Sequence, residues 1–190
     1  MEPLKIMIVG VGGQGTLLAS KLLGRLYMNR GCDIKVSEVH GMSQRGGSVV
    51  THVSCGDRVC SPIVDRGEAD FILSFEMLEA ARWVPYLRTG GLILTNTRQI
   101  SPMPVITGAA DYPSGLADRI RELGLKLDAF DALTPALESG SARAVNLVLL
   151  GRFSRYLDFS EEEWQEAIRA CVPAGYLEMN LTAWQKGRSE

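Results

Sequence analysis

The sequence lacks several features that would assign it to common functional classes. Its 190 residues contain no C-x-x-C pair, and its four cysteines are scattered, at Cys32, Cys55, Cys60 and Cys171. This spacing is unlike that of an iron–sulfur cluster or a structural zinc site, so we expect reduced thiols and no metal held by this chain. The formal net charge of −2 provides no basic surface for nucleic acid.

Long apolar runs and targeting signals are also missing. No segment reaches the roughly 18 uninterrupted apolar residues that a membrane span requires. The first residues, MEPLKIMIVGVGGQG, contain no basic region followed by an A-x-A-like cleavage site. We therefore expect a cytoplasmic protein without a membrane partner.

Apolar runs alternate with helical patterns along the first two thirds of the chain. Five runs predict buried strands: LKIMIV (4–9), IKVSEV (34–39), DFILSF (70–75), GLILTN (91–96) and LKLDAF (125–130). Two further segments, SVVTHVSC (48–55) and RVCSPIV (58–64), are predicted to form a hairpin that turns at Gly56 and Asp57. The run PVIT (104–107) is compatible with another short strand.

Strand signals stop at about residue 134, and the rest of the chain is predicted to be helical. Ser160 and Glu163 have the spacing of a capping box at the start of one of these helices. The order of elements predicts a Rossmann-like, doubly wound α/β fold with a mostly parallel sheet, a β-hairpin insertion and a C-terminal helical segment. We expect a single domain over residues 1–190.

A glycine-rich loop follows the first predicted strand. Gly10, Gly12 and Gly15 form a G-x-G-x-x-G pattern between a strand and a helix, where free N–H groups can bind a phosphate. The same glycines could serve packing alone. An NAD site would use an acidic residue about 20 positions later, and Glu38 is close to that position, although a solvated or paired glutamate is the simpler interpretation.

A second unusual loop lies between the second and third predicted strands, in the sequence HGMSQRGG. Gly46 and Gly47 permit a close approach of the backbone to a ligand or partner. Arg45 offers a planar fork suited to phosphate or carboxylate, and Ser43 adds a neutral hydrogen bond. We expect the first and second strands to end side by side, as in an open parallel sheet, and this loop therefore to lie near the glycine-rich loop. A long surface loop without a ligand is the alternative.

Three polar residues outside these loops could also have roles in a site. His40 could touch a substrate, but a structural role is the simpler interpretation, as it is for His52. Asn146 lies in the apolar run NLVLLG and could contact a ligand, although a buried cap to a neighbouring loop is preferred. No catalytic residue is assigned.

The motifs GVGGQGTLLASKLL, SEVHGMSQRGGSVVTHV and NLVLLG together resemble a known family. They are similar to the gamma-domain family of 2-oxoacid:ferredoxin oxidoreductases, which includes the beta subunit of indolepyruvate:ferredoxin oxidoreductase. The similarity covers about residues 4–186. It implies a Rossmann-like fold and a subunit of a complex that decarboxylates arylpyruvates oxidatively with coenzyme A and passes the electrons to ferredoxin.

The resemblance also implies how cofactors are divided between chains. Thiamine diphosphate, magnesium and iron–sulfur clusters would belong to a larger alpha subunit, and none would be held by this chain alone. Coenzyme A would be the co-substrate. The residues that the resemblance carries over as cofactor-binding are Gly12, Gly13, Gln14, Gly15, Ser43, Arg45, Gly46 and Gly47.

Three functions remain open on the residues alone. The first is a subunit of a 2-oxoacid:ferredoxin oxidoreductase that is inactive by itself. The second is a free-standing NAD(P)-dependent oxidoreductase that uses Gly10, Gly12, Gly15 and Glu38. The third is a scaffold that binds a partner chain and no small molecule.

Overall fold

A computed structural model describes residues 3–40 and 47–189. Its centre is a six-stranded sheet with the order β2-β3-β1-β4-β5-β6. The strands are β1 (Leu4–Val11), β2 (Asp33–His40), β3 (Ser48–Gly56), β4 (Ala69–Ser74), β5 (Leu87–Asn96) and β6 (Lys126–Phe130). β1, β4, β5 and β6 are parallel, whereas β3 is antiparallel to both of its neighbours, β1 and β2. The predicted α/β fold with a mostly parallel sheet is confirmed.

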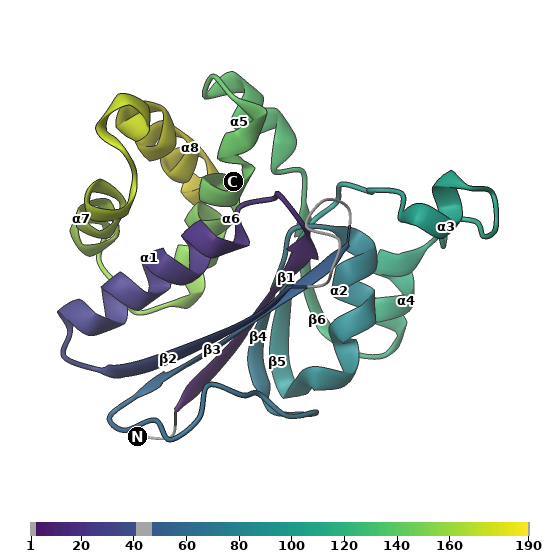
Figure 1. Cartoon of the computed structure of the whole chain (residues 1–190), viewed down its shortest axis with the longest axis horizontal. Helices are drawn as coiled ribbons and strands as arrows, with labels where there is room; N and C mark the ends of the chain where they lie inside the picture. Colours follow the sequence, from purple (N-terminus) through teal and green to yellow (C-terminus); the bar gives the residue numbers. More distant parts are fainter. Residues whose placement is uncertain (1–2, 41–46, 190) are drawn as a thin grey trace.

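Helices cover both faces of the sheet (Figure 1). One face is covered by α1 (Thr16–Asn29) and by the C-terminal helices α5 (Leu133–Glu138), α6 (Val145–Phe153), α7 (Glu161–Cys171) and α8 (Leu177–Ser189). The other face is covered by α2 (Met77–Trp83) and α4 (Leu116–Glu122), while the short α3 (Met103–Ile106) stands apart.

The continuously apolar sequence of β1 is explained by burial on both of its faces. Ile6 and Ile8 pack into the core beneath α1 and α6, whereas Met7 and Val9 pack into the core on the α2 side. All four side chains are completely buried. A central strand with helices on both faces has no solvated side, so the alternation of apolar and polar residues disappears.

The predicted hairpin between residues 48–55 and 58–64 is wrong. The structure contains an antiparallel pair, but it joins β2 to β3, and residues 58–64 form no strand. Backbone N–H groups of this segment donate to side chains instead: Val59 to Asp33 Oδ2 at 2.8 Å, and Val64 to His52 Nδ1 at 3.2 Å. The structural role preferred for His52 agrees with this contact.

Two other local expectations also change. The run PVIT forms no strand and belongs to α3, whose first turn accommodates proline because N–H groups there need no helical acceptor. The second strand does not lie beside the first, since β3 separates β2 from β1. Gly47, the described residue just before β3, nevertheless lies at the glycine-rich loop, because Ser48 pairs with Val11 at the end of β1.

The C-terminal segment packs as helices around a tight crossing of α6 and α8. A Cβ atom on Gly187 would lie 1.9 Å from the Val148 carbonyl oxygen, and one on Gly151 would lie 2.0 Å from the Trp184 carbonyl oxygen. The two backbones therefore touch where both helices lack a side chain. The predicted capping box of Ser160 and Glu163 is present at the start of α7.

We expect Gly187→Ala to destabilise the chain strongly. The methyl group would overlap backbone atoms of α6, and overpacking of this kind costs about 3 kcal/mol at the upper end of its usual range. Gly24→Ala is the matched control, because Gly24 lies inside α1 with open space around its Cα and should gain about 0.5–1 kcal/mol. Urea unfolding of both variants measures the difference; equal stabilities would show that the crossing can relax.

Candidate functional site

The glycine-rich loop occupies the short connection between β1 and α1. Gly13 and Gly15 have φ angles of 95° and 87°, in the left-handed region that residues with a side chain rarely adopt. The Gly12 N–H donates to the Gly47 carbonyl oxygen at 2.9 Å. Of the predicted site residues in the second loop, Gly47 is therefore brought to the first loop, whereas Ser43, Arg45 and Gly46 lie outside the described residues.

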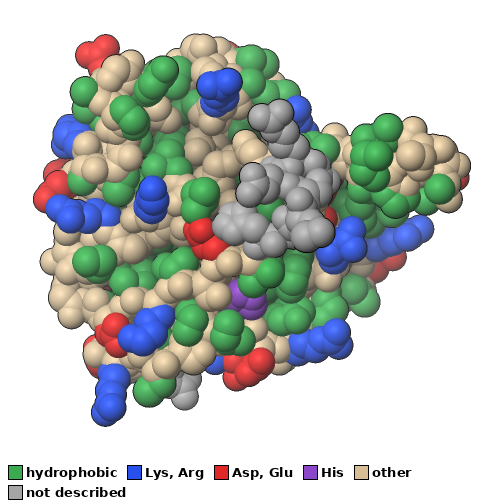
Figure 2. All heavy atoms as spheres, viewed as in Figure 1, with side chains coloured by type: hydrophobic (Ala, Val, Ile, Leu, Met, Phe, Trp, Pro, Cys, Tyr) green, Lys and Arg blue, Asp and Glu red, His purple; other side chains and the backbone are tan. Residues whose placement is uncertain are grey.

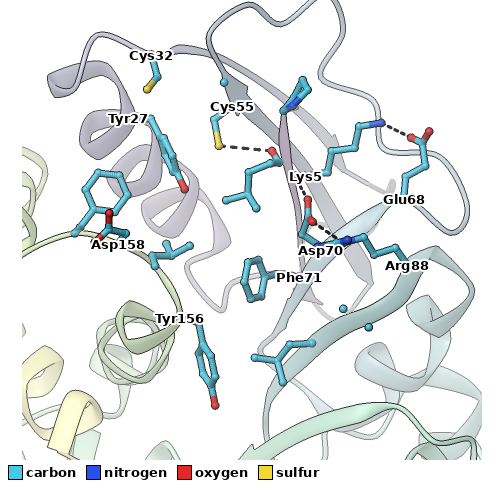
Figure 3. Close-up of a pocket in the computed structure, with 18 of the residues that line it drawn as sticks. Lys5, Tyr27, Cys32, Cys55, Glu68, Asp70, Phe71, Arg88, Tyr156 and Asp158 are labelled. Atoms are coloured by element: carbon cyan, nitrogen blue, oxygen red, sulfur yellow. Dashed lines mark hydrogen bonds and ion pairs between the residues drawn. The ribbon is translucent and has the colours of Figure 1, made fainter. Parts of the chain in front are cut away.

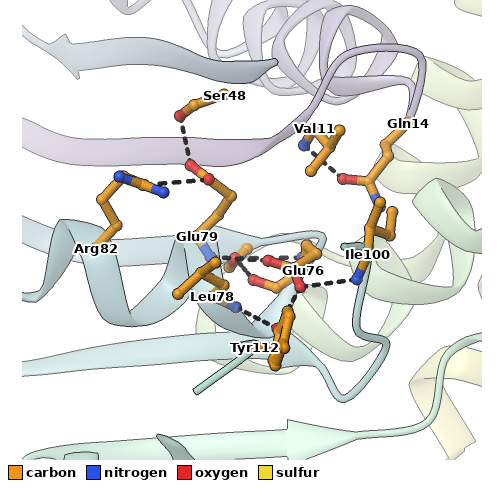
Figure 4. A network of polar contacts seen from close by, with 10 residues as sticks. Val11, Gln14, Ser48, Glu76, Leu78, Glu79, Arg82, Ile100 and Tyr112 are labelled. Carbon is orange, nitrogen blue, oxygen red and sulfur yellow. Dashed lines mark hydrogen bonds and ion pairs between the residues drawn. The ribbon is translucent and has the colours of Figure 1, made fainter. Parts of the chain in front are cut away.

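The side chain of Gln14 braces this loop from within. Its Oε1 accepts from the Val11 N–H at 2.7 Å (Figure 4). Its Nε2 donates to the Phe75 carbonyl oxygen at 3.0 Å. A Cβ atom on Gly10 would lie 2.8 Å from Gln14 Oε1, which explains a glycine at that position. The Gln14 side chain thus links β1 to the residue after β4 through two hydrogen bonds, and both its amide oxygen and its amide nitrogen have a partner within the chain.

Backbone donors remain available at the start of α1. In the described part of the chain, the N–H groups of Gly13, Gly15, Thr16 and Leu17 donate no hydrogen bond. The first N–H groups of a helix have no intrahelical acceptor and carry the positive end of the helix dipole. This end of α1 can therefore bind an anion through backbone groups alone.

Asn146, near the start of α6, faces the same loop. Its Oδ1 accepts from the Leu147 N–H at 2.9 Å, so the amide caps its own helix and not a neighbouring loop. Its Nδ2 would lie 2.6 Å from a Cβ atom on Gly15, and no acceptor for it occurs among residues 3–40 and 47–189. Only 6% of Asn146 is exposed. The Nδ2 of a largely buried residue thus lies beside the unpaired N–H groups of α1.

A buried carboxylate that the sequence did not reveal lies next to the loop, at the start of α2. Glu76 is 1% exposed and accepts three hydrogen bonds, from the Glu79 N–H at 2.9 Å, the Ile100 N–H at 3.1 Å and the Tyr112 hydroxyl at 2.5 Å (Figure 4). Burial, reinforced by Glu76, raises the pKa of Tyr112 above its ordinary value, so this hydroxyl remains a donor.

Glu79 extends the same network toward β3. Its carboxylate accepts from the Ser48 hydroxyl and from Arg82 Nε at 3.2 Å, and the residue is 4% exposed. The carboxylates of Glu76 and Glu79 are thus already occupied by donors of the chain. The hydrogen bonds of Glu76, Glu79 and Gln14 hold the ends of β1, β3 and β4 together. The described groups left without a partner are the backbone N–H donors of the loop and the Asn146 amide nitrogen, which are suited to binding an anion and not to transferring a proton.

Glu38 occupies a position that does not suit a nucleotide ribose. It accepts from the Ser20 hydroxyl of α1 at 3.0 Å. Its strand, β2, lies at the edge of the sheet, and β3 separates it from β1 and from the glycine-rich loop. A dinucleotide fold places the acidic residue at the end of the strand beside β1, so this geometry disfavours the NAD alternative.

A large groove lies at the opposite end of the sheet. It has a volume of about 1160 Å³ and is lined by the first residues of β1 and by residues of β5 and β6. Two ion pairs, between Lys5 and Glu68 and between Arg88 and Asp70, form part of its wall (Figure 3). Burial raises the pKa of the Cys55 thiol beside it to about 12. The predicted site residues that the structure describes, Gly12, Gly13, Gln14, Gly15 and Gly47, do not line this groove.

The described residues contain neither a metal-ligand cluster nor a membrane-spanning helix. Among residues 3–40 and 47–189 there is no group of three or more histidine, cysteine, aspartate or glutamate side chains placed to hold a metal ion. In the same part of the chain, no helix combines the length and the apolar character needed to span a bilayer.

Comparisons with known proteins agree with the fold. Residues 5–190 match the family described as pyruvate ferredoxin/flavodoxin oxidoreductase. The indolepyruvate oxidoreductase subunit IorB of Thermococcus kodakarensis is 43% identical over 98% of this chain and 95% of that one. The ketoisovalerate oxidoreductase subunit VorA of Methanothermobacter marburgensis is 29% identical over 87% of this chain, a match that takes up 31% of that longer chain.

A crystal structure supports the architecture independently. Pyruvate oxidoreductase subunit PORC from Thermotoga maritima has a TM-score of 0.74 with this chain, over 100% of this chain and 97% of that one, at 18% identity. The match extends through the C-terminal helices, so the helical segment belongs to the shared fold.

We expect Gln14→Glu to destabilise the chain although it changes a single atom. The new carboxylate oxygen would face the Phe75 carbonyl oxygen, where Nε2 now donates, and a buried hydrogen bond would be replaced by repulsion. Leaving such a group unsatisfied costs about 1–3 kcal/mol. Thermal unfolding of the lone chain measures the loss, with Gln185→Glu on the exposed surface of α8 as the charge-matched control. Equal melting temperatures would contradict the role of Gln14 as a link between β1 and Phe75.

Proposed function

Because the chain belongs to the pyruvate ferredoxin/flavodoxin oxidoreductase family, we propose that it is the small subunit of an indolepyruvate:ferredoxin oxidoreductase. Its relatives are subunits of 2-oxoacid oxidoreductases. The observation that carries the choice of substrate is the 43% identity, over 98% of the chain, to a subunit named for indolepyruvate. The identity to the ketoisovalerate subunit is 29%, which favours an arylpyruvate.

The proposed reaction is oxidative decarboxylation of a 2-oxoacid with coenzyme A, with two electrons passed to ferredoxin. Thiamine diphosphate with Mg²⁺ supplies the electron sink for decarboxylation when bound, and we assign it, with the iron–sulfur clusters, to a larger alpha subunit. The cysteines of the present chain support this assignment of the iron–sulfur clusters to the larger subunit. Cys55 is buried on β3, Cys60 is exposed, and no C-x-x-C pair exists.

The role that the geometry supports for this chain is to bind a phosphate group of coenzyme A. The unpaired N–H groups of Gly13, Gly15 and Thr16, together with Asn146 Nδ2, form a set of donors at the positive end of α1. Gln14 and the second loop hold this set in place through Val11, Phe75 and the Gly12–Gly47 hydrogen bond. Arg45, which lies outside the described residues, stays a predicted further contact.

The proposed function is tested by reconstitution. The lone chain should show no oxidation of indolepyruvate with a dye acceptor, and activity should appear when the larger subunit encoded with it is added. Activity should depend on coenzyme A and on thiamine diphosphate. Turnover by the purified lone chain would contradict the proposal, as would micromolar NAD binding that Glu38→Ala abolishes.

The proposed phosphate site predicts a specific effect of Asn146→Asp. The substitution keeps the acceptor for Leu147 N–H and places an anion in the first turn of α6, which the helix dipole tolerates. It replaces the donor beside Gly15 by a negative oxygen. Loss of a charge-assisted hydrogen bond corresponds to about 1.5–3 kcal/mol, or a roughly ten- to hundred-fold higher KM for coenzyme A.

The measurement is steady-state kinetics of the reconstituted complex with coenzyme A as the varied substrate. The KM for indolepyruvate and the melting temperature of the lone chain should hardly change. Gln185→Glu adds the same charge on exposed α8 and should leave all three quantities as in the wild type. An unchanged KM for coenzyme A in Asn146→Asp would remove the amide from the site.

A further inference from the structure

A segment at the same end of the sheet projects away from the body of the molecule. Residues 97–115, which we call the arm, connect β5 to α4 and include α3. Figure 1 shows α3 standing clear of the sheet and of the other helices. The arm is not used by the proposed phosphate site, yet it begins beside the strand ends that carry that site.

The middle of the arm carries no charge and exposes apolar side chains. From Ile100 to Ala110 the sequence contains no charged residue, although 22% of the whole chain is charged. Met103 and Ile106 are 62% and 65% exposed. Figure 2 shows hydrophobic atoms gathered on this projection. Single exposed apolar residues are common, but a continuous uncharged stretch on a projection indicates a binding surface.

The arm is nevertheless an ordered structure with its own hydrogen bonds. The Thr107 N–H donates to the Met103 carbonyl oxygen at 2.9 Å, and the Ala109 N–H donates to the Pro104 carbonyl oxygen at 2.8 Å. Prolines at 102 and 104 restrict the backbone further. A surface that is already ordered loses little conformational entropy on binding, so the exposed side chains can contribute fully to association.

Buried Glu76 fixes the base of the arm. Its Oε1 accepts from the Ile100 N–H and from the Tyr112 hydroxyl, so one oxygen holds both ends of the apolar stretch. The Tyr112 oxygen also accepts from the Leu78 N–H at 3.1 Å. The direction of the arm is therefore set by the start of α2 and not by contacts along its own length.

We propose that the arm docks into an apolar concave surface of the larger subunit of the same oxidoreductase. The inference rests on the proposed function, since that function supplies the larger subunit. A unit of this kind occupies 31% of the longer ketoisovalerate oxidoreductase chain, so it forms one part of a larger polypeptide there. Where this unit is a separate subunit, as here, the contacts that it makes with the rest of the enzyme must be formed between two chains.

A second copy of this chain is a poorer fit to the arm. The large groove lies at the opposite end of the sheet, and ion pairs of Lys5 and Arg88 line it. An arm inserted there would join copies head to tail, a heterologous contact that forms open chains unless a rotation closes it. The projecting, uncharged stretch 100–110 of the arm needs a concave apolar partner of different shape.

The test compares Met103→Glu with Met28→Glu in the full chain. Both methionines are exposed to nearly the same extent, 62% and 60%, but Met28 lies near the end of α1, far from the arm. The affinity for the purified larger subunit is measured by calorimetry. Burying a charge in place of an anchor residue should weaken binding by at least about thirty-fold for Met103→Glu, whereas Met28→Glu should bind as the wild type does.

Ile106→Glu serves as the second variant and should weaken binding similarly, while the melting temperature of each lone variant stays near that of the wild type. Wild-type affinity in both arm variants would overturn the inference while leaving the proposed function intact. Equal weakening by Met28→Glu would overturn it too. Self-association of the lone chain that Met103→Glu abolishes would assign the arm to a second copy instead. Absence of any binding by the wild-type chain would overturn the proposed function together with the inference.

Discussion

The carboxylate of Glu76 is the constraint on which the site end of the sheet depends. It is buried, it can only accept hydrogen bonds, and it receives them from Glu79, Ile100 and Tyr112. A buried charge without such donors costs several kcal/mol, so the structure around it must keep all three in place. Those donors belong to the first turn of α2 and to both ends of the arm. One side chain thus links two elements, which are joined further where the Met77 N–H donates to the Arg98 carbonyl oxygen at 3.2 Å and the Leu78 N–H donates to the Tyr112 oxygen at 3.1 Å.

The glycine-rich loop is hydrogen-bonded to Phe75, the residue that precedes Glu76. The carbonyl oxygen of Phe75 accepts from Gln14 Nε2, and the Phe75 N–H donates to the Val9 carbonyl oxygen at 2.9 Å. The end of β4 therefore holds the loop through Phe75 and the arm through Glu76. On the other side of the loop, Asn146 is positioned by α6, whose place is determined by its close crossing with α8 at Gly151 and Gly187. The C-terminal helices are thus part of the site.

The sequence predicts those parts of the molecule that have a local pattern. The apolar run before Gly10 and the glycines at 13 and 15 are sufficient to predict β1, the loop and α1, because positive φ angles require glycine. The hairpin was misassigned because residues 58–64 resemble a strand, while the side chains that bind their N–H groups, Asp33 and His52, lie far away in the sequence.

The residues that hold the site together have no such local pattern. Glu76 has the sequence context of an ordinary helix cap, and its burial depends on Ile100 and Tyr112, which only the tertiary structure brings near. The proximity of Asn146 to Gly15 likewise depends on the packing of α6 against α1. Gln14 was predicted as a ligand contact from the motif, and the structure engages its amide within the chain.

The described groups at this end of the sheet that have no partner within the chain can bind a ligand but include no acid or base, which agrees with a chain that acts as one subunit of a larger enzyme. The carboxylates of Glu76 and Glu79 are occupied by donors of the chain, so they are not placed to exchange a proton with a substrate. Among residues 3–40 and 47–189, the groups that remain at the loop are backbone N–H donors and one amide, which can bind and orient an anion but cannot transfer a proton. Because the loop and the arm are both fixed at Phe75 and Glu76, docking of the arm and binding at the loop act on the same strand end. A partner that holds the arm rigidly also restricts the loop, so assembly and ligand binding are expected to favour each other.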